Sequence, residues 1–214
     1  MRALLICLLA LLPAFPLPTM AKGEKAGAFD YYVVALSWSP NWCELEGDAR
    51  NSPQCDAAED HGWILHGLWS QMTQSFPSYC RSTYRMPSKS MTANMADIMG
   101  TSRLAWHQWR KHGVCSGLSP SDYYALSRAA YARINRPAVF RKLERDVKLP
   151  TAVVEDAFLK ANPDMEPGGI TITCKQGHIQ EARICLSRDL QPVQCGRDVV
   201  HDCTMTDALF TPIR

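Results

Sequence analysis

The sequence predicts an α+β domain in which a central antiparallel sheet packs with several helices and is stapled by disulfides. Aromatic and β-branched stretches occupy both ends of the chain and helical patterns the middle, an order typical of this class. The 214 residues are 46% apolar and 21% charged, as in a single globular domain that can bury a core. Nine Cys are present, and eight of them lie beyond an apolar leader.

The first half of the chain predicts two strands separated by a polar segment. Residues 29–38 are rich in aromatic and β-branched side chains and predict the first strand. Residues 41–60 are polar, contain two Cys and predict a disulfide-bonded loop. Residues 63–69 predict the second strand, and a loop follows to residue 90.

Helical patterns fill the middle of the chain. Gly100 and Gly113 end two of the predicted helices, and Ser119 followed by Pro120 is a typical helix start. The predicted helices cover residues 91–99, 104–112, 120–135, 137–147 and 151–162. The chain then returns to short β-rich stretches joined by turns, and the predicted strands cover residues 170–174, 179–187 and 193–195.

Residues 1–21 predict a signal peptide, which leaves residues 22–214 as the mature domain. A short positive start precedes a continuous apolar run over residues 3–12, and Thr19 and Ala21 flank a cleavage point. The apolar run is too short to span a bilayer, although a retained signal anchor is the alternative. We therefore expect an exported protein without stable membrane association.

The cysteine count agrees with export, because an even number of Cys in an exported chain indicates disulfides. A metal site is the alternative, but the chain has no CxxC pair. The sequence does not choose among the pairings of Cys43, Cys55, Cys80, Cys115, Cys174, Cys185, Cys195 and Cys203.

The net charge of +2 excludes a broad electrostatic grip on a polyanion, so any nucleic-acid contact must be local. One local cluster stands out. His107, Gln108, Lys111 and His112 share an arc of about 140° on a helix, which suits a phosphate better than a divalent cation. His66 lies apart, in an apolar strand. Two imidazoles and an ammonium supply the base, acid and cation that RNA cleavage through the 2′-hydroxyl needs.

Simpler interpretations remain open at this point. His107 and Lys111 suit an ordinary solvated helix face, and His66 suits a hydrogen-bonded core histidine. A weak zinc site at His107 and His112 is a further alternative, although no HExxH motif is present.

Two segments resemble the signature blocks of the ribonuclease T2 family, exported endoribonucleases that cut RNA with little base preference. They are residues 63–69, WILHGLW, and residues 104–115, LAWHQWRKHGVC. Residues 29–32 and 38–40 also resemble the first strand of the family. The resemblance implies cleavage of single-stranded RNA to 2′,3′-cyclic phosphate ends without metal or cofactor, with later hydrolysis to 3′-phosphates as a second step.

The resemblance also implies a role for each site residue. His112 would take the 2′-hydroxyl proton, and His66 would protonate the 5′-leaving oxygen. His107 would bind the phosphate, Lys111 would stabilise its growing charge, and Trp69 would offer a face to a base.

Gln108 belongs to the same catalytic set but stands where the family usually has Glu, and its amide cannot raise histidine basicity by charge. The implied disulfides are Cys43–Cys55, Cys80–Cys115, Cys174–Cys203 and Cys185–Cys195.

RNA is the expected substrate, and we expect a monomer with no protein partner. The compact leader and the lack of an Asn-x-Ser/Thr acceptor favour a bacterial protein, periplasmic or extracellular. Two other functions stay open: a non-catalytic RNA-binding protein on the same fold, and a metal hydrolase that uses His107 and His112.

Overall fold

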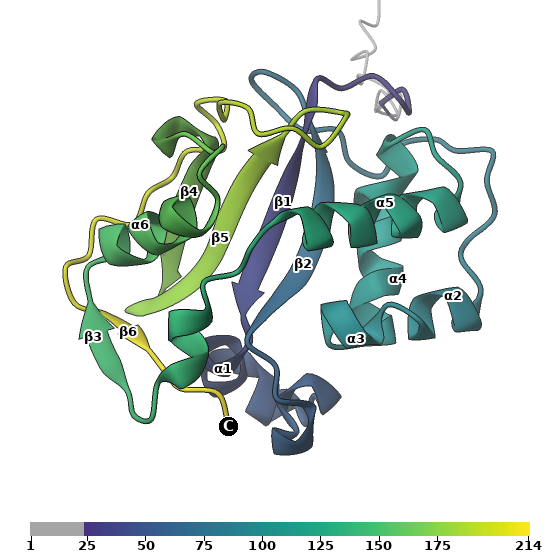
Figure 1. Cartoon of the computed structure of the whole chain (residues 1–214). Coiled ribbons are helices and arrows are strands. Elements are labelled where there is room, and N and C mark those ends of the chain that lie inside the picture. The colour runs from purple at the N-terminus through teal and green to yellow at the C-terminus, as the bar shows by residue number, and fades with distance from the viewer. Residues whose placement is uncertain (1–23) are drawn as a thin grey trace, which may run out of the picture.

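Six strands form one sheet at the centre of the computed structural model, which describes residues 24–214 (Figure 1). The strands are β1 (Tyr31–Trp38), β2 (Trp63–Gln71), β3 (Val147–Leu149), β4 (Ile170–Lys175), β5 (His178–Leu186) and β6 (Ala208–Phe210). Their order is β2-β1-β5-β6-β3, and β4 pairs with β5 beside this path. Neighbours run antiparallel, as predicted, except for one parallel pair between β5 and β6.

Six α-helices surround the described sheet. They are α1 (Ser39–Trp42), α2 (Lys89–Ala93), α3 (Ala96–Met99), α4 (Ser102–Lys111), α5 (Pro120–Arg133) and α6 (Thr151–Ala161). Figure 1 shows α2 to α5 gathered on the β2 side, whereas α6 lies beside β4. Hydroxyl caps begin the two long helices of the β2 side: Thr101 accepts from the N–H of Leu104, and Ser119 accepts from that of Asp122.

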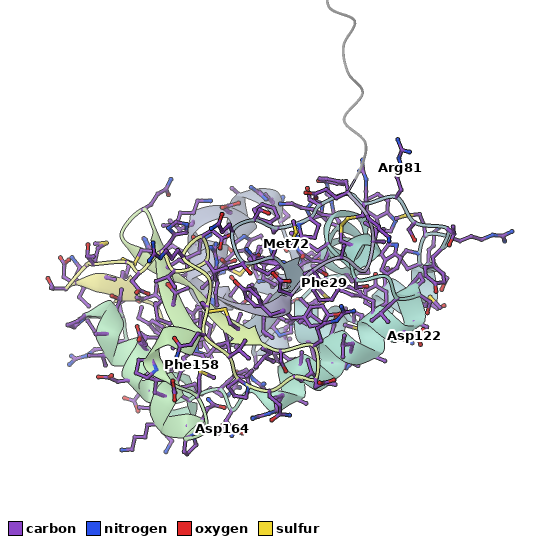
Figure 2. All side chains as sticks on the ribbon, turned by 90° about the horizontal axis from the view of Figure 1, so that it is seen from above. Phe29, Met72, Arg81, Asp122, Phe158 and Asp164 are labelled. Atoms are coloured by element: carbon purple, nitrogen blue, oxygen red, sulfur yellow. A yellow bond between two sulfur atoms is a disulfide. The ribbon has the colours of Figure 1, made fainter. Side chains whose placement is uncertain are left out.

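Aromatic side chains fill the core between the helices and the sheet. Trp38 lies at its centre, with ring centroids 4.5 Å from Phe210 and 5.2 Å from Trp63. Phe158 of α6, labelled in Figure 2, also packs against Trp63, with ring centroids 5.2 Å apart. These rings join β1, β2, β6 and α6 into one core cluster.

A second set of contacts fixes α4 against β2. The ring of Trp109 on α4 is fully buried and packs at 5.6 Å against Tyr123 of α5. The hydroxyl of Tyr123 donates to the backbone carbonyl of Leu68 on β2, at 2.9 Å. One face of α4 is thereby held in the core, and its polar face turns outward.

Two predicted elements are wrong. Residues 137–147 form a 3₁₀ turn at Ala138–Lys142 and then enter β3, because Val147 and Leu149 alternate about Lys148 as strand residues do. The predicted strand at residues 193–195 is absent from the described structure. The nearest β-bridge joins Leu186 to Pro192, one residue before the segment, and a proline has no N–H to continue a ladder. Within the segment, the N–H of Val193 donates to Cys185 and that of Cys195 to Gly168, so its hydrogen bonds go to different parts of the chain.

Two further expectations need refinement. The predicted helix at 91–99 is two short helices, α2 and α3, and Gly100 ends the second with φ of 76°. The predicted loop at residues 41–60 begins within α1 and continues as short helical turns. The sequence also did not predict β6.

The four disulfides have the pairing that the resemblance implied: Cys43–Cys55, Cys80–Cys115, Cys174–Cys203 and Cys185–Cys195. Cys80–Cys115 joins the loop after β2 to the 3₁₀ turn that follows α4. Within residues 24–214, no helix has the length and apolar character that a membrane span requires.

Opening the Cys80–Cys115 bridge should destabilise the domain more than opening Cys185–Cys195. The first bridge closes a sequence separation of 35 residues and the second one of 10. The loss of loop-closure entropy in the unfolded chain therefore predicts a difference of about 1 kcal/mol between the paired Cys→Ser variants. Urea unfolding of both variants measures it, and equal free energies of unfolding would contradict it.

Candidate active site

His66 is the extra residue of a β-bulge in β2. On β1, Ala35 pairs with Gly67 and Leu36 pairs with Leu65, so His66 has no partner across the ladder. A bulge of this kind re-aims one side chain without breaking the strand. His66 is half-buried while Leu65 is fully buried, and its imidazole opens onto a cavity instead of the core.

The polar face of α4 lines the same cavity, which has a volume of about 320 Å³. His107, Gln108 and Lys111 belong to the helix, and His112 follows its last turn. The structure therefore brings together all six residues that the sequence predicted for the site, Trp69 included. The cavity is also lined by Val33, Gln71, Phe76, Gln180, Glu181, Arg183, Asp198 and Val199.

Glu181 of β5 is the site residue that the sequence analysis missed. Its buried carboxylate is hydrogen-bonded to Nδ1 of His66 and accepts from Nε of Arg183 at 2.9 Å. Burial alone would raise the pKa of Glu181, but the hydrogen bond and charge of His66, together with Arg183, lower it to about 2. An ionised Glu181 can only accept, so Nδ1 of His66 carries the proton. The sequence held one signal for this residue: Glu181 is the single acid in the predicted strand at residues 179–187.

A hydrogen bond between Trp69 and Gln108, both of which line the cavity, joins β2 to α4. The indole N–H of Trp69 donates to Oε1 of Gln108 at 2.9 Å. Only glycine fits beside this bond, because a Cβ on Gly67 would lie 2.2 Å from that oxygen and 2.3 Å from the indole nitrogen. The Gln108 amide therefore positions Trp69.

The ring of Trp69 also packs against both histidines of the site. His112 stacks on it with centroids 5.2 Å apart and planes inclined by 26°, and His66 meets it edge-on at 5.5 Å. The two histidines predicted as base and acid thus lie against one indole. Because His112 already stacks on Trp69, the geometry favours a supporting role, and stacking of a base on Trp69 stays a prediction.

His112 is buried, with only 4% of its surface exposed. Burial lowers its pKa to about 3, and the positive charges of Lys111, His66 and His107 act in the same direction. Burial, followed by Lys111 and His66, also lowers the pKa of His107. The Nδ1 atom of His112 is buried and has no hydrogen-bond partner among residues 24–214.

A second cavity of about 280 Å³ adjoins the first and shares His66, Gln180 and Glu181 with it. Its other walls come from Ser37, Trp42, Glu46, Arg50, Gln54, Ile64 and Leu104. His66 therefore lies between the two cavities and lines both of them. In the described part of the chain, no three His, Cys, Asp or Glu side chains gather as a metal site would need.

Known proteins are similar to this chain in sequence or in fold. The sequence model of the Ribonuclease T2 family matches residues 29–195. A protein named Ribonuclease from Aeromonas hydrophila is 32% identical over 213 residues, which is 95% of each chain. An RNase-related protein from Calystegia sepium superposes with a TM-score of 0.66 at 18% identity, covering 89% of this chain and 98% of that one. RNase NT, solved in complex with 5′-AMP, gives a TM-score of 0.62 at 16% identity, covering 86% and 98%.

The depressed pKa of His112 should make stability fall in acid. An unfolded chain binds a proton at His112 below pH 6.5, whereas the folded chain does so only near pH 3. The free energy of unfolding should therefore fall as the pH drops through this window, by on the order of 4 kcal/mol at pH 3. Urea unfolding at stepped pH should show a smaller fall for His112→Asn. Parallel curves for the two proteins would refute this assignment.

Proposed function

The chain belongs to the ribonuclease T2 family, and from that premise we propose how its two adjoining cavities cleave RNA. It is an endoribonuclease. The reaction is transesterification in single-stranded RNA: the 2′-oxygen attacks the neighbouring phosphorus, the 5′-oxygen leaves, and a 2′,3′-cyclic phosphate forms. Hydrolysis of the cyclic phosphate to a 3′-phosphate is the second step. No metal takes part in either step.

The observation that carries this proposal is that His66 and His112 open onto one cavity together with a lysine. His112 is neutral in the empty site, because its pKa is about 3, and a neutral imidazole can take the 2′-hydroxyl proton. The phosphate brings negative charge beside it, which stabilises the imidazolium that forms.

His66 acts from the other side as the general acid. Glu181 holds Nδ1–H of the ring, which leaves Nε2 as the nitrogen that meets substrate. Protonated at Nε2, His66 delivers a proton to the departing 5′-oxygen, and in the second step the same atom accepts one from water. Glu181 is thus a positioning residue, because it acts through His66.

Lys111 and His107 complete the phosphate site. Both line the cavity from the exposed side of α4, one turn apart, where their N–H groups can reach the non-bridging oxygens. Preorganised cations at this place stabilise the charge that grows in the transition state. The cavities on either side of His66 have room for the two nucleosides that flank the scissile phosphate.

We also propose that the protein works outside the cytoplasm as a monomer. The signal peptide over residues 1–21 would direct export, and four disulfides suit an oxidising compartment such as a bacterial periplasm.

The proposed roles predict a specific pattern of activity. With excess chelator, the wild-type protein should cut single-stranded RNA and leave 2′,3′-cyclic phosphate ends after a short digest. His66→Ala and His112→Ala should each lower kcat/KM by about 10²- to 10⁴-fold, because each removes a proton-transfer group. His201→Ala is the matched control, because His201 is exposed and lies outside both cavities, and it should cut at the wild-type rate.

Three results would oppose the proposal in different ways. No cleavage at any pH from acid to neutral would favour a non-catalytic RNA-binding protein. Loss of cleavage in chelator would favour a metal hydrolase. Full activity of His112→Ala would refute its role as base.

Glu181→Gln should lower kcat by about ten- to a hundredfold, because the imidazolium of His66 loses the carboxylate that holds and stabilises it. KM should change little, because Glu181 acts on the reaction only through His66. Glu144→Gln, at an exposed position outside both cavities, is the control. An unchanged kcat, or a loss confined to KM, would mean that Glu181 has only a structural role.

A further inference from the structure

The outward face of α4 carries more than the catalytic residues. Arg103, Trp106, His107 and Arg110 are all exposed and follow the i, i+3, i+4, i+7 spacing of one helix face. His107 belongs to the first cavity, and Leu104 of the same helix lines the second. Arg103, Trp106 and Arg110 therefore lie on the exposed face of α4 next to the side chains that line the two cavities.

Exposed aromatic side chains concentrate at this place. Among residues 24–214, the aromatic residues with large exposed surfaces are Phe76, Tyr79, Tyr84 and Trp106, at 39 to 51%. Tyr79 and Trp106 contact one shared cation, since the guanidinium carbon of Arg110 is 5.7 Å and 5.5 Å from their ring centroids. We call Tyr79, Arg103, Trp106 and Arg110 the α4 strip.

Phe76 joins the α4 strip to the catalytic centre. Its ring lines the first cavity, 6.2 Å from that of His112. Phe76 and Tyr79 belong to the same loop, and the backbone N–H of Tyr79 donates to the carbonyl of Lys111 at 2.8 Å. A ligand that leaves the cavity past Phe76 therefore meets the α4 strip next.

Tyr79 has an unusual backbone for a bulky residue. Its φ of 51° lies in the left-handed region, which costs free energy for a side chain of this size. The hydrogen bond to Lys111 and the adjacent Cys80–Cys115 disulfide hold it there. The result is an aromatic ring kept half exposed beside α4.

The segment that contains α4 carries positive charges and no negative ones. Residues 98–121 contain Arg103, Arg110 and Lys111 and no Asp or Glu. The acid just before them, Asp97, is paired with Arg128. In the described structure, neither Arg103 nor Arg110 forms an ion pair, so both charges remain available. In a chain of net charge +2, this is a local complement to a polyanion.

We propose that the α4 strip binds the stretch of single-stranded RNA that continues beyond the scissile dinucleotide. Tyr79 and Trp106 stack bases, and Arg103 and Arg110 contact phosphates, a combination that binds single strands without sequence preference. The proposal rests on the proposed function of the cavities. It makes the enzyme prefer long substrates over dinucleotides.

The test compares a dinucleoside monophosphate with an RNA of about 12 nucleotides, a length that can cover the cavities and the α4 strip. Arg103→Gln, Trp106→Ala and Tyr79→Gly should each lower kcat/KM on the long RNA by about fivefold, the lower end of what one stacked base or phosphate contributes. The same variants should cleave the dinucleotide as the wild type does. Arg110 is left intact because its charge helps lower the pKa of His107.

Two controls separate binding from folding. Glycine accepts the left-handed backbone, so Tyr79→Gly should not lower the melting temperature although it removes the ring. Arg145→Gln removes an exposed arginine beside β3, at the opposite end of the sheet from β2, and should change neither reaction.

A binding measurement adds a readout that is independent of catalysis. Single-stranded DNA lacks the 2′-hydroxyl and cannot be cleaved by this route, so its Kd can be followed against salt. Arg103→Gln should reduce the slope of log K against log salt by about 0.7, the contribution of one phosphate contact.

Equal losses on the long RNA and the dinucleotide would overturn the proposal, and so would a wild-type enzyme that does not prefer the long RNA. If only Arg103→Gln has an effect, stacking on Tyr79 and Trp106 is refuted. A wild-type protein that cuts neither substrate refutes the proposed function instead.

Discussion

The close approach of α4 to β2 at Gly67 is the constraint on which the site depends. Because residue 67 has no Cβ, the Gln108 amide can reach the indole of Trp69, and the helix lies directly on the strand. That contact sets His112 on the face of Trp69, while the bulge turns His66 toward the edge of the same ring. A larger residue at position 67 would collide with both the Gln108 amide and the Trp69 indole, so one of them would have to move.

Charge in the site is unbalanced in a way that suits a phosphate. Lys111, His107 and the imidazoles of His66 and His112 face one cavity. Of the two carboxylates that line it, Glu181 is engaged by His66 and Arg183, and Asp198 accepts a hydrogen bond from Gln71. The low pKa of His112 follows from burial among these groups. In the proposed mechanism, the phosphate of the substrate would add negative charge beside these groups, so substrate binding and protonation of His112 would favour each other.

A nearly neutral protein can still bind a polyanion if its free charges are concentrated. Several surface arginines of the described chain form ion pairs, as Arg133 does with Asp164 and Arg214 with Asp48. Arg103 and Arg110 have no such partners among the described residues, and both lie on the helix that carries His107 and Lys111. The proposed α4 strip would therefore place two unpaired cations beside the proposed catalytic residues.

The sequence by itself determined the elements whose signals are local. The aromatic and β-branched composition of β1, the apolar run of β2, the cap at Ser119 and the shared helix face of His107 and Lys111 are local features of the chain. The two blocks identified the ribonuclease family. Tertiary structure alone decided the rest. The pairing of β3 with β6 joins segments far apart in the chain, and Glu181 meets His66 across 115 residues. Spacing within one element does not encode such contacts, because they depend on how the elements pack in three dimensions.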